Sequence, residues 1–363
     1  MDKRMDKLSE FTAIDVYSGS GAVTEGLKVE GITVLAAVDN DPIACETYRL
    51  NHPEVHLFEA DIRSLNPITM RNGISFSGHL DLLVVCAPCQ PFSSQNRKRA
   101  SDDPRADLIL ESLKFIKEFE PKVVFFENVP GIAISGPLAS LRNKLAKIGY
   151  CLGEPKNLNA ADCGVPQRRE RCIMVAARSS VRIKAFYNAI MPRPNMTVRH
   201  AIGKLRQLCS GERDPDDSLH FARNHRPAVL RRLQYIPFDG GSRSSLPVEL
   251  ELACHKGRKN DFPDVYGRMH WDDVAPTLTT GCTDVTKGRF VHPRDNRAIT
   301  LREAALLQSF PSQYRFFGSS SQIARQIGNA VPVDMIRSLV PALKKSLQPI
   351  QNTESRTLTG RCP

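Results

Sequence analysis

The sequence lacks the features that mark membrane-spanning, secreted and disulfide-stabilised proteins. No run of apolar residues approaches the ~18 that a transmembrane helix needs, and the charged residues 1–7 have no apolar stretch behind them, which argues against a signal peptide. Its ten cysteines are scattered, without the dense spacing of a disulfide scaffold. Because only one Cys-x-x-Cys pair occurs, there is no second pair to complete a zinc site. We therefore expect a cytoplasmic protein with no membrane segment and no metal site.

The chain does have length and positive charge. Its 363 residues are enough for one large domain and one smaller one. Lys and Arg outnumber Asp and Glu by 50 to 39, and the net charge of +11 favours a polyanionic partner. Charge alone does not identify that partner, so its nature has to be inferred from motifs.

One cysteine follows a predicted core strand directly. Residues 82–85 are apolar and partly β-branched, which predicts a buried strand, and they run into Ala87-Pro88-Cys89-Gln90-Pro91. An open α/β sheet binds its ligands at the carboxyl ends of its strands, and the two prolines restrict the backbone on either side of the thiol. Cys89 is therefore a candidate nucleophile. The alternatives are a small buried hydrophobic residue or a redox or zinc pair with Cys86.

A glycine turn near the start predicts a nucleoside site. Residues 11–38 read as strand, tight turn over residues 18–21, helix and strand, and the second strand ends at Asp39. Such a unit lets a ligand approach the glycines closely and places an acid beside ribose hydroxyls. Thr24 occupies the place of the third glycine of the dinucleotide motif, which disfavours a pyrophosphate-bearing cofactor such as NAD. The alternative is a turn that binds nothing.

Two further acids follow predicted strands. Asp61 comes after residues 55–58, where its carboxylate could accept a hydrogen bond from an adenine amino group. Glu127 ends the strand predicted over residues 122–126, next to the strand that leads to Cys89. Burial tends to raise the pKa of such a carboxyl group, so Glu127 could hold a proton near neutral pH. The alternative for Glu127 is a helix or turn cap.

Arginines alternate at the start of a later predicted strand. Arg169 and Arg171 precede residues 172–176 with one residue between them, which places both side chains on one face. Guanidinium groups suit a phosphate or a base carbonyl. The alternative is a solvated charged edge.

The regular alternation of strands and helices fades after residue 179. Residues 181–275 are rich in proline, arginine and polar turns, and they carry sixteen basic against eleven acidic side chains. Basic, aromatic and amide side chains of this kind read base edges and phosphates. Further on, Thr300 and Glu303 form a capping box that starts a helix, a last helix is predicted over 333–347, and the tail 348–363 looks disordered. Helices are also expected over residues 41–51, 107–119 and 138–148.

Taken together, these segments resemble the cytosine-C5 DNA methyltransferase family over about residues 11–345. Each motif is weak alone, but their order is highly specific. The motifs are Asp15 to Gly21, Pro88-Cys89-Gln90, Glu127-Asn128-Val129, Gln167-Arg168-Arg169-Glu170-Arg171, Arg297 to Glu303, and Gly328 to Pro332. Three positions depart from the family pattern, because Tyr17 stands where phenylalanine is commoner, Asp39 where glutamate is, and Ala87 in place of a proline.

The resemblance implies an α/β fold with two domains. A doubly wound, Rossmann-like sheet that binds S-adenosylmethionine (SAM) would span residues 11–180 plus 318–347, and a smaller target-recognition domain would span 181–317, with its variable part at 181–275. The chain would return near its end to line the cofactor site. The implied cofactor-binding residues are Tyr17, Gly19, Gly21, Asp39, Asn40, Asp61, Ile62, Pro88, Asn329 and Val331.

The resemblance also implies covalent catalysis on cytosine. The Cys89 thiolate would add to C6 and make C5 nucleophilic, while Glu127 would hydrogen-bond N3 and the exocyclic amine. Arg169 and Arg171 would hold the base carbonyl and the nearby backbone. The base that removes the C5 proton is not visible in the sequence, and a water molecule is a reasonable choice.

A duplex hides C6 in its base stack, so the cytosine has to be flipped out. A flap over about residues 93–105 is expected to close over the flipped base, with cationic side chains on phosphates. The implied DNA-binding residues are Ser93, Arg97, Lys98, Arg99, Thr279 and Arg297.

The expected partners are double-stranded DNA, which would bring a bacterial protein to the nucleoid, and a cognate restriction endonuclease that acts on the same site. One flipped base per chain needs only a monomer. Three other functions stay open at this stage. They are an RNA (tRNA) cytosine-C5 methyltransferase of the same fold, a catalytically silent nucleic-acid-binding homologue, and a nicotinamide oxidoreductase, which the missing third glycine disfavours.

Overall fold

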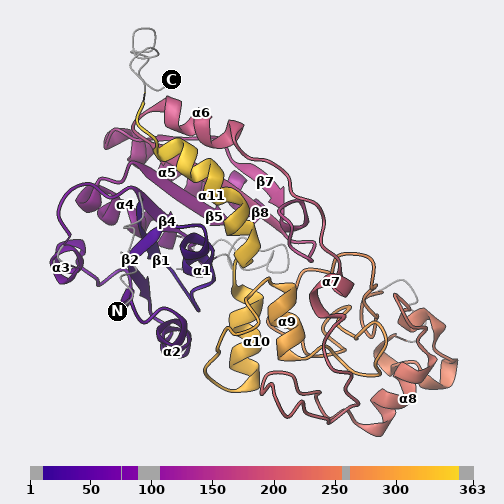
Figure 1. Ribbon diagram of the computed structural model, residues 1–363. Helices are drawn as coiled ribbons and strands as arrows, with labels where there is room; N and C mark the ends of the chain where they lie inside the picture. Colours follow the sequence, from indigo (N-terminus) through magenta and orange to yellow (C-terminus); the bar gives the residue numbers. More distant parts are fainter. Residues whose placement is uncertain (1–10, 75, 89–106, 256–261, 351–363) are drawn as a thin grey trace. The chain divides into compact units, whose positions relative to one another are not determined.

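The computed structural model describes residues 11–74, 76–88, 107–255 and 262–350, which form two compact units (Figure 1). Of the described residues, those within 11–159, 170–192 and 335–350 belong to unit 1, and those within 160–169 and 193–334 belong to unit 2. The expected Cys89 and flap, and most of the expected disordered tail, lie outside the described residues.

Unit 1 contains one eight-stranded sheet in the order β3-β2-β1-β4-β5-β8-β6, with β7 also paired to β8. The strands are β1 Thr12–Val16, β2 Thr33–Asp39, β3 His56–Glu59, β4 Leu82–Val85, β5 Val123–Asn128, β6 Cys151–Leu152, β7 Lys156–Asn159 and β8 Glu170–Ala177. The first five strands in the chain pair in parallel, whereas β8 runs antiparallel to β5, β6 and β7. This is the expected doubly wound α/β sheet, whose order reverses between β1 and β4.

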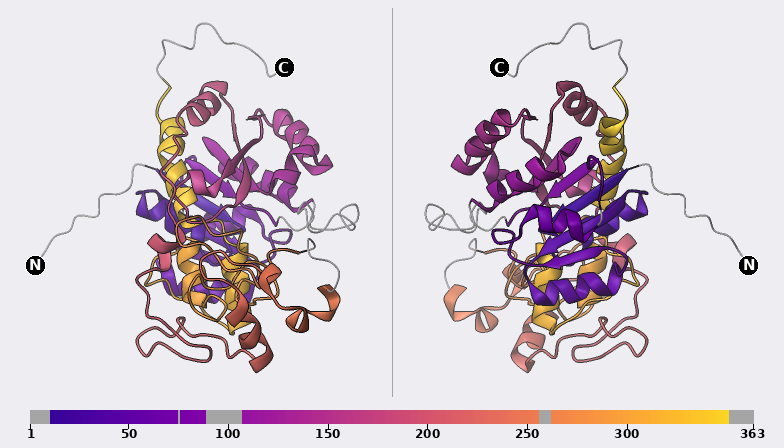
Figure 2. Two further views of the ribbon diagram at one scale, coloured as in Figure 1. Left: turned by 90° about the vertical axis from the view of Figure 1, so that its right-hand side faces the viewer. Right: turned by 90° about the vertical axis from the view of Figure 1, so that its left-hand side faces the viewer.

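Helices cover both faces of this sheet (Figure 2). The helices of unit 1 are α1 Ala22–Val29, α2 Pro42–Asn51, α3 Pro67–Gly73, α4 Leu108–Phe119, α5 Gly136–Lys147, α6 Ser180–Asn188 and most of α11 Val333–Leu347. Apolar side chains of α3, α4 and α5 pack with alternate strand residues such as Ile14 and Phe126 in one core. On the opposite face, Phe186 of α6 meets Phe125, and Arg182 Nη1 donates a 2.6 Å hydrogen bond to the Ser346 carbonyl of α11.

The described part of unit 2 has helices, short 3₁₀ turns and isolated β-bridges, with no extended strand. Its elements are η4 Ala160–Asp162, α7 Val198–Ile202, α8 Pro227–Tyr235, η5 Arg243–Ser245, η6 Val248–Leu250, η7 Ala253–His255, α9 Leu301–Leu307 and α10 Ser320–Asn329. Thr300 caps α9 through the predicted capping box with Glu303. A fully buried arginine, Arg268, replaces sheet pairing as a cross-link, because its guanidinium donates hydrogen bonds to the carbonyls of Leu233, Ile236, His292 and Asp295.

The division into units differs from the expected boundaries at residues 180 and 318. Helix α6 lies after the first boundary but belongs to unit 1, because it packs against β8. Helix α10 was expected in the catalytic domain but belongs to unit 2, where it packs against α9. The side chain of Gln308 also binds the carbonyls of Ile327 and Ala330 at the end of α10.

Among the residues that the structure describes, no helix has both the length and the apolar composition needed to cross a membrane.

Candidate active site

A pocket opens in unit 1 where the sheet order reverses between β1 and β4. It encloses about 360 Å³, including the part that is open to solvent. Its lining residues are Tyr17, Val38, Asp39, Asn40, Ala60, Asp61, Ile62, Arg63, Pro88 and Leu108. These side chains follow the carboxyl ends of β1, β2, β3 and β4, which is where open α/β sheets bind nucleosides. The pocket brings together six of the residues expected at a cofactor site: Tyr17, Asp39, Asn40, Asp61, Ile62 and Pro88.

The glycine turn is held to β2 by the acid at the end of that strand. Gly19 and Gly21 have φ angles of 53° and 90°, which L side chains adopt only with strain. The Gly19 N–H donates to Asp39 Oδ2 over 2.8 Å, and the Asp41 N–H donates to Oδ1 over 2.9 Å. Burial raises the pKa of Asp39, and these two backbone hydrogen bonds oppose the rise. Asp39 therefore fixes the turn while its carboxylate still lines the pocket.

Tyr17 makes a contact that a phenylalanine at this position, the commoner residue in the family that the sequence resembles, could not make. Its hydroxyl donates a 2.5 Å hydrogen bond to the carbonyl of Leu108, the first residue of α4 and another pocket residue. The residue has a φ of 64°, so the chain is strained where the turn begins. Burial raises the pKa of the Tyr17 hydroxyl, which stays a hydrogen-bond donor. The departure from phenylalanine thus ties the pocket wall to α4.

A buried polar chain lies next to this turn, on the face of the sheet covered by α1 and α2. Asp15 is fully buried, and its Oδ2 accepts a 2.9 Å hydrogen bond from the Thr24 hydroxyl. The Thr24 hydroxyl is in turn 2.8 Å from the Tyr48 hydroxyl. Asp15 Oδ1 has no hydrogen-bond partner among the described residues, and burial raises the pKa of Asp15 to about 7. Thr24, which stands in place of a third glycine, is thus the hydrogen-bond donor to a buried acid.

Glu127 and Arg171 form an ion pair at the end of β5. Glu127 is 2% exposed, and its Oε1 lies 2.9 Å from Nε of Arg171. The sheet register explains this contact, because Glu127 pairs with Ile173 and the side chain of Arg171, two residues away, lies diagonally opposite on the same face. Sequence reasoning placed both residues at the site, and the structure brings them together.

The next residue, Asn128, links β5 to the chain that leads toward Cys89. Its Nδ2 donates a 3.1 Å hydrogen bond to the carbonyl of Ala87. Strands β4 and β5 are adjacent and parallel, with Val85 beside Phe126, so the segment after β4 leaves the sheet next to Glu127. Cys89 itself lies outside the described residues, as do Ser93, Arg97, Lys98 and Arg99, so their roles stay predictions.

The structure places the side chain of Arg169 among backbone carbonyls of unit 2. Its side chain is 2% exposed within unit 2, where Nη1 donates to the Leu278 carbonyl and Nη2 donates to those of Gly328 and Ala330. These bonds to three backbone carbonyls make the guanidinium a cross-link within the unit. The expected contact of Arg169 with a base carbonyl stays a prediction. The other arginine, Arg171, contacts Glu127 through its Nε atom.

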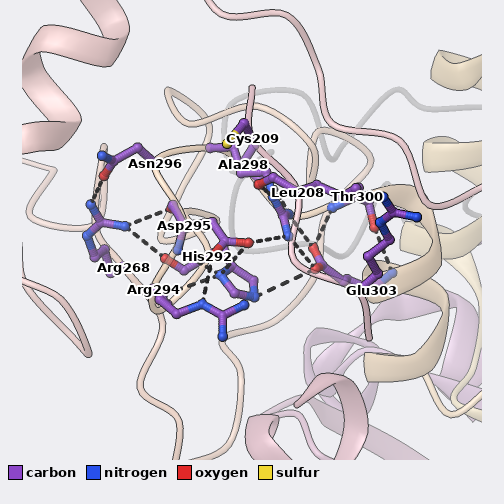
Figure 3. A network of polar contacts seen from close by, with 12 residues as sticks. Leu208, Cys209, Arg268, His292, Arg294, Asp295, Asn296, Ala298, Thr300 and Glu303 are labelled. Atoms are coloured by element: carbon purple, nitrogen blue, oxygen red, sulfur yellow. Dashed lines mark hydrogen bonds and ion pairs between the residues drawn. The ribbon is translucent and has the colours of Figure 1, made fainter. Parts of the chain in front are cut away.

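Arg297, which was expected to contact DNA, lies in the interior of unit 2. Arg297 is fully buried, and its guanidinium forms 2.8 Å hydrogen bonds to Asp295 and to both oxygens of Glu303. Figure 3 shows His292, Asp295 and Glu303 gathered in this network. Arg297 lowers the pKa of Glu303 to about 2 despite complete burial. Arg297 therefore stabilises the start of α9, since the same Glu303 completes the capping box.

Three further expected residues lie in unit 2. Thr279 is half-buried, and its hydroxyl accepts a hydrogen bond from the Gly281 N–H. Asn329 is exposed at the end of α10, and Val331 is buried. Their contacts with DNA or a cofactor stay predictions.

Arg63, Leu108 and Asn128 belong to the site but were not predicted from the sequence. Asn128 had a usable signal, because it stands between Glu127 and Val129 at the end of a predicted strand. Arg63 lies two residues beyond Asp61, but nothing in its pattern distinguishes it from a solvated charge. Within the described ranges, no group of three or more His, Cys, Asp or Glu side chains is arranged to hold a metal ion.

The sheet order, the nucleoside-type pocket and the buried Glu–Arg pair are typical of a methyltransferase of the Rossmann-like class. Comparison with known proteins agrees. The sequence model of the C-5 cytosine-specific DNA methylase family matches residues 11–345. The Type II methylase M.HgiDII of Herpetosiphon aurantiacus is 38% identical over 348 residues, which cover 92% of this chain and 95% of that protein. The Type II methyltransferase M.NgoMIV of Neisseria gonorrhoeae is 32% identical, with 93% and 99% covered.

Solved structures share the fold. The Entamoeba histolytica methyltransferase EhMeth aligns with a TM-score of 0.64 at 18% identity, covering 93% of this chain and 99% of that one. The chain belongs to the C-5 cytosine-specific DNA methylase family. It is therefore an enzyme, a DNA cytosine methyltransferase, and its relatives are methyltransferases of the Type II restriction-modification class. The family and the fold imply the use of SAM.

Proposed function

We propose that this enzyme transfers a methyl group from SAM to C5 of a flipped cytosine within a specific duplex DNA sequence, through a covalent Cys89–C6 adduct. The main support is the buried Glu127–Arg171 pair, with its 2.9 Å contact at the edge of the sheet where β4 leads toward Cys89. A nucleoside-type pocket opens at the same edge of the same unit.

The pocket residues fit SAM. The ring of Tyr17 would form an aromatic wall, and Asp39 would place an acid beside the ribose. Asn40, Asp61 and Ile62 would contact the adenine with polar and apolar groups. The turn at Gly19 leaves open space where a Cβ atom would stand, so a ligand can approach the backbone. SAM bound there would supply an electrophilic methyl group, and Pro88, the residue before Cys89, would be among the residues that hold it. Asn329 and Val331 would complete the cofactor site.

The chain's own residues would activate the cytosine. The Cys89 thiolate adds to C6, forming an S–C bond and moving electron density to C5 and N3. Glu127 would face N3 and the exocyclic amine, where it stabilises the charge that develops. Arg171, already paired with Glu127, would orient that carboxyl group and contact the base carbonyl. After methyl transfer, a water molecule takes the C5 proton and the S–C bond breaks, which restores the ring and frees Cys89.

The remaining roles concern DNA. Residues 181–275 would recognise the target sequence, and Thr279 and the segment that contains Ser93, Arg97, Lys98 and Arg99 would contact the DNA around the flipped base. A cognate restriction endonuclease would act on the same sequence, and a monomer would suffice for one flipped base. We expect the protein in the cytoplasm, associated with the nucleoid.

Bisulfite sequencing of genomic and plasmid DNA from cells that express the chain tests this proposal. The expected result is methylated cytosine at one short motif, absent when Cys89→Ser is expressed at the same level. Exchange of residues 181–275 with those of another family member should change the motif. Unmodified DNA from cells that contain folded, SAM-binding protein would refute the DNA substrate, and tRNA would be tested next.

A further inference from the structure

The acid at the adenine end of the pocket is already occupied by a neighbouring arginine. Asp61 and Arg63 both line the pocket, and their side chains are 33% and 60% exposed. Asp61 Oδ1 accepts hydrogen bonds from the Arg63 backbone N–H over 2.9 Å and from its Nε over 3.0 Å. Oδ2 accepts from Nε over 3.1 Å and from Nη2 over 2.5 Å.

These contacts occupy most of the acceptor positions of the carboxylate. An ionised carboxylate offers about four acceptor positions, two on each oxygen. Three N–H groups of Arg63 contact the two oxygens of Asp61, with Nε shared between them, so an incoming amino group has to compete with the guanidinium for the carboxylate. The same hydrogen bonds from Arg63 lower the pKa of Asp61, so its carboxyl group stays ionised.

The side chain of Arg63 can move away from Asp61 without disturbing the backbone of the turn. The Asp61 carbonyl accepts hydrogen bonds from the N–H groups of Ser64 and Leu65, and Lys114 Nζ donates to the Arg63 carbonyl over 3.0 Å. These contacts fix the backbone turn, including the N–H that binds Oδ1. The guanidinium, on an exposed and flexible side chain, is the group that a ligand can displace.

We propose that Arg63 competes with the cofactor for Asp61: its guanidinium holds the acid in the free pocket and must release it when the 6-amino group of adenine binds. This inference rests on the proposed use of SAM. The affinity for an adenine ligand is then reduced by the fraction of molecules in which Arg63 holds Asp61.

The same geometry makes Arg63 a determinant of base selectivity. The 6-amino group of adenine donates a hydrogen bond, which Asp61 can accept once it is released. The 6-oxo group of hypoxanthine accepts a hydrogen bond, which Asp61 cannot donate but the Arg63 guanidinium can. Removal of Arg63 should therefore strengthen binding of the adenine ligand and not of the hypoxanthine ligand.

Calorimetric titration with S-adenosylhomocysteine and with S-inosylhomocysteine tests this proposal. Arg63→Ala should bind S-adenosylhomocysteine about three- to tenfold more tightly than the wild type, with no gain for the hypoxanthine analogue. Arg49→Ala is the matched control, because Arg49 is another exposed arginine of unit 1 with two acidic partners, Glu46 and Glu59, and does not line the pocket. Its affinity should stay within about twofold of the wild type.

A double-mutant cycle shows whether Arg63 acts through Asp61. In an Asp61→Asn background, where the neutral amide cannot form the charged pair, Arg63→Ala should no longer tighten binding. Higher salt should also tighten binding by the wild type more than by Arg63→Ala, because an exposed ion pair is screened. Arg63→Ala that binds S-adenosylhomocysteine as weakly as the wild type, or more weakly, overturns the inference while leaving SAM use intact. A wild type that binds neither ligand refutes the cofactor assignment itself, and the inference with it.

Discussion

Asp15→Asn should remove a pH-dependent loss of stability. Asp15 is fully buried, with one hydrogen bond from Thr24, and its pKa is raised from 3.8 to about 7 by burial. The unfolded chain releases this proton near its ordinary pKa, whereas the folded protein keeps it up to about pH 7. The folded state thus binds more protons in that window, so stability falls as pH rises from about 4 to about 7. Asparagine, which has a similar shape and does not titrate, lacks this loss.

The size of the effect follows from the pKa shift. One pKa unit corresponds to ~1.4 kcal/mol, so the two units between pH 5 and the folded pKa of about 7 amount to roughly 3 kcal/mol. Urea unfolding of both proteins at about pH 5 and about pH 8 measures it. The difference in unfolding free energy between Asp15→Asn and the wild type should rise by roughly 3 kcal/mol in favour of the variant. Other titrating groups are common to both proteins and cancel in this difference.

A second variant guards against a misleading result from the new amide. Thr24→Val keeps Asp15 but removes the hydroxyl that donates to it. Because that hydrogen bond stabilises the ionised form, its loss should extend the fall in stability to higher pH. A difference between Asp15→Asn and the wild type that stays constant from pH 5 to pH 8 would refute the reasoning, since Asp15 would then titrate alike in both states.

Three further predictions concern other parts of the chain. Glu127→Gln should lower methyl transfer at least ~100-fold with unchanged affinity for S-adenosylhomocysteine, and equal turnover in a tritium-transfer assay would contradict the role of Glu127 at N3. Arg297→Lys should lower the unfolding free energy in urea by ~3 kcal/mol, because lysine cannot bind Asp295 and both Glu303 oxygens at once. A change below about 1 kcal/mol would show that the network is dispensable. Tyr17→Phe should lower the unfolding free energy by ~1 kcal/mol, because it removes the hydrogen bond to the Leu108 carbonyl. Its affinity for S-adenosylhomocysteine, measured by calorimetry, should stay within about threefold of the wild type. An affinity loss beyond about tenfold would show that the hydroxyl itself contacts the cofactor.

Local sequence patterns were sufficient to predict the central strands of the sheet and where they end. Apolar runs bounded by glycine, proline and acids predicted β1, β2, β4 and β5 to within about two residues, because a core strand needs continuous apolar side chains and a break where it leaves the sheet. The capping box at Thr300 was predicted for a similar reason, since its two hydrogen bonds form between residues three apart. The acid at the end of β5 could likewise be placed from the sequence.

The boundaries of the units and several short helices could not be predicted from the sequence. Helices α7, α8 and α10 have ten residues or fewer, and a short helix depends on tertiary packing more than on its own propensity. Helix α10 belongs to unit 2 because of contacts with α9 and Gln308, which lie earlier in the chain. Nothing local in residues 320–329 encodes that choice.

Tertiary contacts determine which charged side chains are available for function, and local sequence does not reveal them. Arg169 and Arg297 have the same side chain as Arg171, yet the first two are buried against backbone carbonyls or acids, while Arg171 pairs with Glu127. Tyr17 and Leu108 are 91 positions apart in the chain, and their hydrogen bond exists only because β1 and α4 meet at one pocket. A sequence pattern gives the chemical type of each group, but the donors and acceptors that saturate it come from distant segments, and these decide whether it can bind a substrate.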